Sequence, residues 1–319
     1  MDGYVESLNY ESSDMRREER IVLLQQAHFL LTYACNLECD HCFVYSSPSA
    51  EGTFTSDQMK KVMRELRKLG TVDYVFFEGG EPFLYYPLML EGIRLARDAG
   101  FDVGIVTNGY WATDAKDAEL WLRPLKELDL AGLSVSDDEF HYEDKENAAR
   151  CAMRAAKKLH MSSSSITIET PRLATKKGGR KGEPVVGGGI MFRGRAVEKL
   201  VDELPRRPWR EFPECPYEDL RDPKRVHLDS YGNVHLCQGL SMGNMWRTPL
   251  SRLVKNYDVG KHPIAGPLEK GGPALLAKTH KVKHEDRYVD ACHMCYAIRL
   301  ALLDRFPECL APRQCYGIM

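Results

Sequence analysis

Three cysteines, Cys35, Cys39 and Cys42, stand within eight residues directly after the apolar run of residues 27 to 34. Three thiolates at this spacing predict a metal site on the loop after a buried strand. A structural zinc ion takes four ligands, so His41 or a more distant residue would have to complete the site. A four-iron, four-sulfur cluster held by three cysteines instead keeps one iron open for a small molecule. The cysteines alone leave both alternatives open.

The whole chain of 319 residues is long enough for one large domain, or for a barrel-sized domain with a smaller one. Its 44 basic and 46 acidic residues give a formal charge of −2, which indicates no general affinity for nucleic acid or membranes. No apolar run approaches the roughly 20 residues that span a bilayer, and residues 1 to 20 do not resemble a secretory signal. We expect a cytoplasmic protein whose ten cysteines bind metal or stay reduced.

Apolar runs of strand length alternate with helical patterns through the first half of the chain. Strands are predicted at residues 27 to 34, 73 to 77, 101 to 106, 130 to 135 and 165 to 169. Helices are predicted from a capping box at Thr55 and Gln58 to Gly70, and at residues 88 to 99, 114 to 128 and 143 to 159. Because strands that alternate with helices pair in parallel through right-handed crossovers, the pattern predicts an α/β fold with a parallel sheet.

Polar or glycine-rich motifs follow the second, third and fourth predicted strands. They are Phe77-Glu78-Gly79-Gly80-Glu81-Pro82, Thr107-Asn108-Gly109 and Ser134-Val135-Ser136-Asp137. Two adjacent glycines allow a backbone to approach a ligand closely, although a simple turn closed by proline explains them equally well. Ser134 and Ser136 lie on one side of their strand by its period of two.

These motifs, taken in order, resemble the radical S-adenosylmethionine (radical SAM) superfamily. Its signature is CxxxCxxC after the first strand, followed by a GGEP-like motif after the second. An aromatic residue usually precedes the last cysteine, and His41 stands there in this chain. The resemblance implies a partial (βα)6 TIM-type barrel with a [4Fe-4S] cluster on Cys35, Cys39 and Cys42.

The resemblance also implies an activity and a binding site for S-adenosylmethionine. The reduced cluster cleaves this cofactor to a 5′-deoxyadenosyl radical, which abstracts a hydrogen from a substrate. The residues that the resemblance assigns to cofactor binding are Gly79, Gly80, Glu81, Asn108, Ser134 and Ser136. No catalytic side chain is assigned.

Residues 172 to 210 form a basic segment with eleven basic and four acidic residues and two glycine clusters. A solvated loop explains this composition, and a loop that binds an anion or covers a substrate is the alternative. Gly194-Arg195-Ala196 within it is similar to a GRA triplet of many family members.

A second set of cysteines follows, with a hairpin predicted at residues 225 to 236. Accessory domains called SPASM or twitch resemble this part of the chain in two elements, Gly232-x4-Cys237 and the later pair Cys292-x2-Cys295. The resemblance implies a second [4Fe-4S] cluster, held by Cys215, Cys237, Cys292 and Cys295. The full SPASM pattern has further cysteines, but Ala301 occupies one of those positions, so the resemblance favours a one-cluster, twitch-like domain. A second cluster using Cys309 and Cys315, or zinc at the four cysteines, remains an alternative.

Several other residues are interpreted as structural. Asp229 opens an Asp-x-x-Gly turn, Cys151 is a buried thiol, and His141, His227 and His235 are surface or core residues.

Three domains are predicted: a lead-in at residues 1 to 26, the partial barrel at 27 to 204 and the accessory cluster domain at 205 to 319. The expected function is that of a radical SAM enzyme, an oxidoreductase or a modifying enzyme acting on a peptide or a small metabolite. Its expected partner is a low-potential electron donor such as flavodoxin or ferredoxin. A zinc or iron–sulfur protein without radical chemistry, contacting RNA through the basic segment, is the alternative.

Overall fold

The computed structural model describes residues 22–144, 146–175 and 184–318. Residues 1 to 21 of the predicted lead-in at residues 1 to 26 lie outside the described residues.

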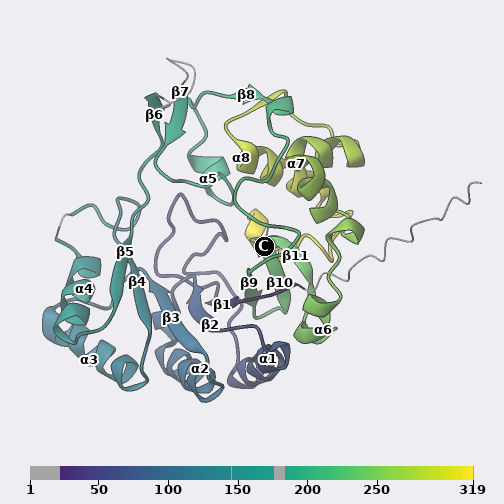
Figure 1. Cartoon of the computed structure of the whole chain (residues 1–319). Helices are drawn as coiled ribbons and strands as arrows, with labels where there is room; N and C mark the ends of the chain where they lie inside the picture. Colours follow the sequence, from purple (N-terminus) through teal and green to yellow (C-terminus); the bar gives the residue numbers. More distant parts are fainter. Residues whose placement is uncertain (1–21, 145, 176–183, 319) are drawn as a thin grey trace, which may run out of the picture.

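One eight-stranded sheet forms the centre of the molecule, in the order β11-β10-β9-β1-β2-β3-β4-β5 (Figure 1). Neighbours from β9 to β5 pair in parallel, whereas β10 and β11 are antiparallel. The strands are β1 (Gln26–Thr32), β2 (Tyr74–Gly79), β3 (Asp102–Thr107), β4 (Gly132–Ser136), β5 (Ser163–Ile166), β9 (Arg225–Asp229), β10 (Asn233–Cys237) and β11 (Leu240–Asn244). The predicted α/β class with a parallel sheet of partial-barrel type is confirmed.

Four helices cover the outer face of the parallel strands (Figure 1). They are α1 (Ser56–Leu69), α2 (Tyr86–Asp98), α3 (Ala115–Glu127) and α4 (Ala148–Lys158). Helix α1 begins at the predicted capping box, in which Thr55 and Gln58 bond each other's backbone N–H groups, and ends at Gly70 with φ 69°. Such a box adds about 1 kcal/mol to helix stability.

The sheet differs from the sequence prediction in its sixth parallel strand. We expected six consecutive strand–helix units, but after β5 the next strand of this sheet is β9, which lies beside β1 at the opposite side of the parallel set. The predicted hairpin supplies it, since β9 pairs with β10 through a turn in which Gly232 N donates to Asp229 O at 3.0 Å. A parallel pairing across some 200 residues leaves no local trace in the sequence.

The remaining elements surround a second apolar core beside the hairpin. Its helices are α7 (Ala265–His280), which is kinked at Gly271 and Gly272, and α8 (Ala291–Leu302). Helix α6 (Leu250–Lys255) instead buries Leu250 and Val254 in the first core, beside the parallel strands. Two small sheets pair β6 (Arg172–Thr175) with β7 (Pro184–Gly187), and β8 (Arg207–Pro208) with β12 (Arg287–Tyr288), and α5 (Ala196–Lys199) lies between them in the chain. Within the described ranges no helix is both long and apolar enough to cross a bilayer.

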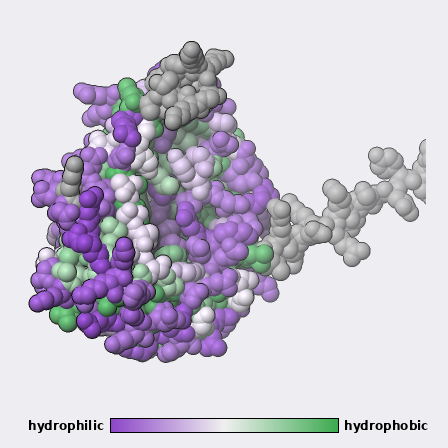
Figure 2. All heavy atoms as spheres, turned by 60° about the vertical axis from the view of Figure 1, so that its left-hand side comes forward, coloured by the Kyte–Doolittle hydropathy of each residue, from purple (hydrophilic) through white to green (hydrophobic). Residues whose placement is uncertain are grey.

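The face shown in Figure 2 is mainly hydrophilic, with neutral and apolar residues gathered in a band near its middle.

Candidate functional site

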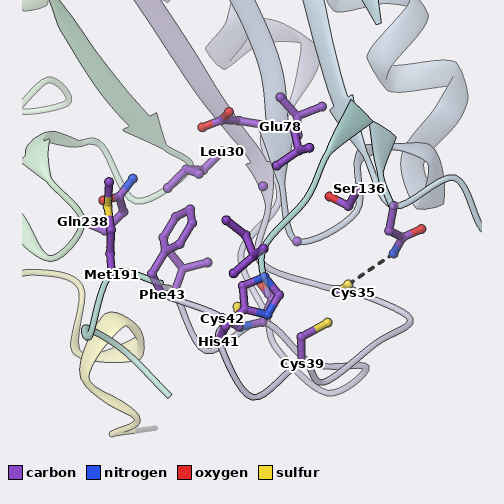
Figure 3. A pocket seen from close by; sticks show the side chains of 18 of the residues that line it. Leu30, Cys35, Cys39, His41, Cys42, Phe43, Glu78, Ser136, Met191 and Gln238 are labelled. Atoms are coloured by element: carbon purple, nitrogen blue, oxygen red, sulfur yellow. Dashed lines mark hydrogen bonds between the residues drawn. The ribbon is translucent and has the colours of Figure 1, made fainter. Parts of the chain in front are cut away.

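A cavity of about 380 Å³ opens at the carboxyl ends of the parallel strands (Figure 3). Side chains from the cysteine loop, from β1 to β5 and from the hairpin line it. Among the predicted site residues, the lining contains Cys35, Cys39, Cys42, Gly79, Gly80, Asn108 and Ser136. The fold therefore brings the cysteine loop and the ends of three strands to one cavity.

The three cysteines of the loop differ in exposure. Cys35 is buried, whereas Cys39 and Cys42 are partly exposed. Burial, with the charges of neighbouring groups, raises the pKa of Cys35 to about 11 and that of Cys39 to about 12. Backbone N–H groups of Leu37 and Ser46 point at the sulfurs of Cys35 and Cys42, at 3.4 and 3.3 Å. A bound cation would offset the cost of these desolvated thiolates, and N–H donors would stabilise them further.

The glycine pair packs closely against the chain's own backbone. An added Cβ at Gly79 would lie 2.4 Å from Thr32 O, and one at Gly80 would lie 2.1 Å from Ala34 O. Both positions line the cavity, but close contact with the end of β1 already requires glycine there. The glycines were predicted to let a ligand approach their backbone closely. In the structure, the end of β1 makes such a close approach.

Glu81 is completely buried, and hydrogen bonds to the next loop occupy its carboxylate. Oε1 accepts from Thr107 Oγ1 at 2.8 Å and from Phe83 N at 3.0 Å, while Oε2 accepts from Asn108 N at 2.7 Å. Burial raises its pKa to about 7 against the opposing effect of these bonds. The described lining of the cavity does not include Glu81. Its geometry is that of a positioning residue, which fixes the loop after β3 against the loop after β2.

Asn108 connects that loop to the cysteines. Its Nδ2 donates to Asn36 Oδ1 at 2.9 Å and lies 3.8 Å from Cys35 Sγ, and its Oδ1 accepts from Tyr110 N at 3.0 Å. Ser136 faces the cavity (Figure 3). Ser134 instead pairs with Ser164, at 3.2 Å between their hydroxyl oxygens, and is not in the described lining.

His41 precedes the last cysteine of the loop, where the sequence resemblance predicts an aromatic residue. Its ring packs against the wall of the cavity. Its centroid lies 4.5 Å from that of Phe140 and 5.3 Å from that of His141. Burial lowers the pKa of His41 to about 4, so the ring is neutral at pH 7. Asp138, which the sequence did not single out, holds His141 through an Oδ1–Nδ1 contact of 2.7 Å. His141 thus lines the wall rather than the surface.

The GRA triplet fixes the cysteine loop from behind. Arg195 donates to Cys39 O at 2.7 Å and to Ser46 O at 2.8 Å, and its backbone N–H bonds Cys42 O at 2.9 Å. Gly194 has φ 62°, and a Cβ there would lie 2.5 Å from Phe43 Cα. The sequence resemblance identified this triplet but assigned it no role. Its contacts indicate that it holds the cysteine loop in place.

A second, smaller pocket brings together all four cysteines of the later set. Cys215, Cys237, Cys292 and Cys295 line it with Arg193 and Arg299. Burial raises the pKa values of Cys215, Cys292 and Cys295, the last to about 12. Arg193 Nη1 lies 2.8 Å from Cys237 Sγ, and Arg299 is 1% exposed. Arg193 is distant from these cysteines in sequence, whereas Arg299 follows Cys295 by four residues on α8, one helical turn away.

The other cysteines lie apart from this pocket, and all ten are free thiols. Cys309 and Cys315 are absent from its described lining. Cys315 is buried 3.9 Å from the hydroxyl of Tyr33, and Cys151 is buried in α4 as the sequence predicted. Asp229, predicted as a turn residue, is fully buried and accepts from Tyr33 at 3.0 Å and from Asn233, and it pairs with the core residue His235 at 3.0 Å.

Comparisons with known proteins agree with this arrangement. The sequence model of the Radical SAM superfamily matches residues 29–203. The putative peptide biosynthesis protein YydG of Bacillus subtilis (strain 168) is 28% identical over 107 residues, which cover 34% of each chain. An AdoMet-dependent heme synthase of Methanosarcina barkeri (strain Fusaro / DSM 804) is 35% identical over 118 residues, covering 37% of this chain and 32% of that protein. The matched region thus spans about a third of these curated relatives.

A crystal structure titled "BtrN in complex with AdoMet and 2-DOIA" shares the fold. Its TM-score is 0.50 at 16% identity, and the match covers 74% of this chain and 84% of that one.

Proposed function

Because the chain belongs to the radical SAM superfamily, we propose that Cys35, Cys39 and Cys42 hold a [4Fe-4S] cluster and that the adjoining cavity binds S-adenosylmethionine. The observation that carries this proposal is that three thiols and the polar ends of β2, β3 and β4 line one cavity. Three thiolate ligands leave one iron open for the cofactor.

The three sulfurs are not gathered as closely as the ligands of a zinc ion. At a Zn–S distance of about 2.3 Å, tetrahedral geometry places thiolates roughly 3.8 Å apart. In the part of the chain that the structure describes, the groups whose ligand atoms all lie within 4.8 Å of one another contain no cysteine. His41 belongs to such a group with Asp138 and His141, so it is not gathered with the cysteines as a fourth zinc ligand.

When bound, the cluster and S-adenosylmethionine supply a 5′-deoxyadenosyl radical that abstracts a hydrogen from the substrate. The chain's own residues position the reactants and exclude water. Arg195 fixes the cysteine loop and Glu81 fixes the loop that carries Asn108. Apolar side chains such as Phe43 and Met191 wall the cavity opposite Ser136 (Figure 3).

Replacing Asn108 with alanine tests the assignment of the cofactor pocket. The variant loses the bonds to Tyr110 N and Asn36 Oδ1, worth about 0.5–1.5 kcal/mol each, so the loop holds the cofactor less firmly. We expect binding of S-adenosylmethionine to weaken by roughly three- to tenfold in an equilibrium titration, with iron content unchanged. Thr113→Ala, at an exposed position before α3, is the control. Equal affinity in both variants would refute a role for the loop after β3.

A peptide is the substrate class that we propose. The support is the similarity to YydG, whose name is that of a peptide biosynthesis protein. A cavity of about 380 Å³ has the size of a small-molecule site and admits a short piece of an extended peptide, not a folded domain. A small metabolite is the alternative substrate.

Mass spectrometry after anaerobic incubation with S-adenosylmethionine, a reductant and candidate peptides tests this choice. We expect a mass change in a peptide that appears only with intact Cys35, Cys39 and Cys42. A change confined to small metabolites in cell extract would overturn the peptide assignment and leave the radical reaction in place.

The four later cysteines are proposed to hold a second, fully ligated [4Fe-4S] cluster in a twitch-like accessory region of residues 205 to 319, whose strands β9, β10 and β11 extend the central sheet. Their common pocket supports this, and the cations Arg193 and Arg299 would balance the charge of four thiolates. Arg193 lines both pockets, so the second cluster would lie beside the main cavity. A low-potential donor such as flavodoxin or ferredoxin would supply electrons, and free thiols suit the reducing cytoplasm.

A further inference from the structure

We propose that His28, Glu78 and His227 form a binding site for a first-row divalent transition-metal ion in the wall of the main cavity, separate from both cysteine sets. The site needs no radical chemistry, so it stands or falls apart from the proposed function.

The three side chains come from three adjacent strands. His28 on β1 pairs in register with His227 on β9, so both rings project from the same face of the sheet. Glu78 lies near the end of β2, on the other side of β1. All three side chains line the main cavity, and Figure 3 shows Glu78 across it from Cys39.

Their ligand atoms converge. His28 Nδ1 lies 3.3 Å from Glu78 Oε2, and His227 Nε2 lies 3.0 Å from Glu78 Oε1. The three ligand atoms all lie within 4.8 Å of one another. Bonds of about 2.0–2.2 Å to a tetrahedral metal place ligand atoms roughly 3.4 Å apart, so small movements suffice to admit an ion.

Packing fixes the His28 ring. It stacks on Phe76 with centroids 4.4 Å apart, and its centroid lies 4.9 Å from that of His227. Gly104 makes room for Phe76, since a Cβ there would lie 2.5 Å from that ring. An ion would therefore meet this ligand already oriented, which reduces the entropy lost on binding.

The surrounding polar groups match a metal site. Gln26 Oε1 lies 3.4 Å from His28 Nε2, where it accepts a hydrogen bond from Nε2–H and leaves the Nδ1 lone pair for a metal. Gln238 is 5% exposed, and its Nε2 lies 3.3 Å from His227 Nε2. Its Oε1 is buried with no hydrogen-bond partner among the described residues. Rotation of the Gln238 amide by 180° would place that oxygen where Nε2 lies, 3.3 Å from His227 Nε2, and offer it to the ion.

Two imidazoles and one carboxylate are the ligand set of catalytic zinc sites and of non-heme iron sites, both of which keep an open position. Here an open position would face the cavity, where the ion would bind a carboxylate or carbonyl oxygen of the substrate. The metal would thus anchor the substrate.

Mn²⁺ is the probe, because this first-row ion favours carboxylate oxygen over thiolate, so it does not compete for cysteines filled with iron, and imidazole nitrogen can complete its ligand set. Full-length, anaerobically reconstituted protein with oxidised clusters is titrated with Mn²⁺, and free ion is followed by electron paramagnetic resonance. We expect one Mn²⁺ per chain, with hyperfine coupling to two imidazole nitrogens. Glu78→Gln and His227→Asn should each weaken binding by more than about 100-fold, beyond what loss of an outer partner costs.

His160→Asn is the matched control, since His160 is exposed and its φ of 54° suits asparagine. Iron content and melting temperature verify that each variant is folded. Absence of Mn²⁺ binding by folded native protein would overturn the proposal and leave a hydrogen-bonded triad. Binding that persists unchanged in both variants would also overturn it. If one of the two variants fails to fold, the proposal is tested by Mn²⁺ binding to the other variant and by the imidazole coupling in the native protein.

Discussion

Replacement of Cys35, Cys39 and Cys42 with alanine is expected to lower the iron content of anaerobically reconstituted protein from about eight to about four per chain. The three thiols line one cavity and are the proposed ligands of one four-iron cluster. Without them, the spectral change caused by S-adenosylmethionine should also vanish, because the remaining cluster would have no open iron.

The control for this experiment is Cys151→Ala, which removes a buried thiol from α4. Its iron content should equal that of the native chain. Iron that stays near eight in the triple variant would show that these cysteines are not ligands. Stoichiometric zinc in anaerobically purified protein, without iron, would refute both clusters.

Replacement of Cys292 and Cys295 with alanine should remove about four irons and lower the melting temperature. These cysteines lie in the first two turns of α8, while Cys215 and Cys237 come from chain segments far before it. A metal bound by all four joins these segments, so its binding free energy contributes to the stability of the fold. The variant would also remove two of the sulfur groups that face the buried guanidinium of Arg299. Iron analysis and thermal unfolding measure both effects.

Cys309→Ala is the comparison variant, since Cys309 lies outside the described lining of that pocket. It should keep all its iron and melt close to the native chain. The first cluster's response to S-adenosylmethionine should survive in the Cys292 and Cys295 variant. If that variant keeps its iron and its melting temperature, the four cysteines are not ligands.

Local features of the fold were predictable because their physical causes are local. The capping box of α1 and the alternation of strands and helices depend on residues a few positions apart. The motif order placed Cys35, Gly79, Asn108 and Ser136 at the ends of successive strands, and in parallel sheets these ends meet at one edge. This rule explains why the four residues line one cavity.

Features that depend on distant pairings were missed. β9 joins β1 across some 200 residues, and this pairing alone brings His227 to His28 and Glu78. His227 was therefore interpreted as an ordinary surface or core residue. Arg193 reaches the later cysteines in the same way. The carboxylate of Glu81 accepts hydrogen bonds from Thr107 and Asn108 in the loop after β3, which no spacing could reveal, and its contact with the cofactor stays a prediction.

Formation of 5′-deoxyadenosine tests the central claim most directly. The reconstituted native chain is reduced anaerobically and incubated with S-adenosylmethionine, and the products are quantified by liquid chromatography. The account predicts 5′-deoxyadenosine and methionine from the native chain, and none from the variant lacking Cys35, Cys39 and Cys42. No 5′-deoxyadenosine from native protein carrying its full iron content, or equal amounts from both chains, would contradict it.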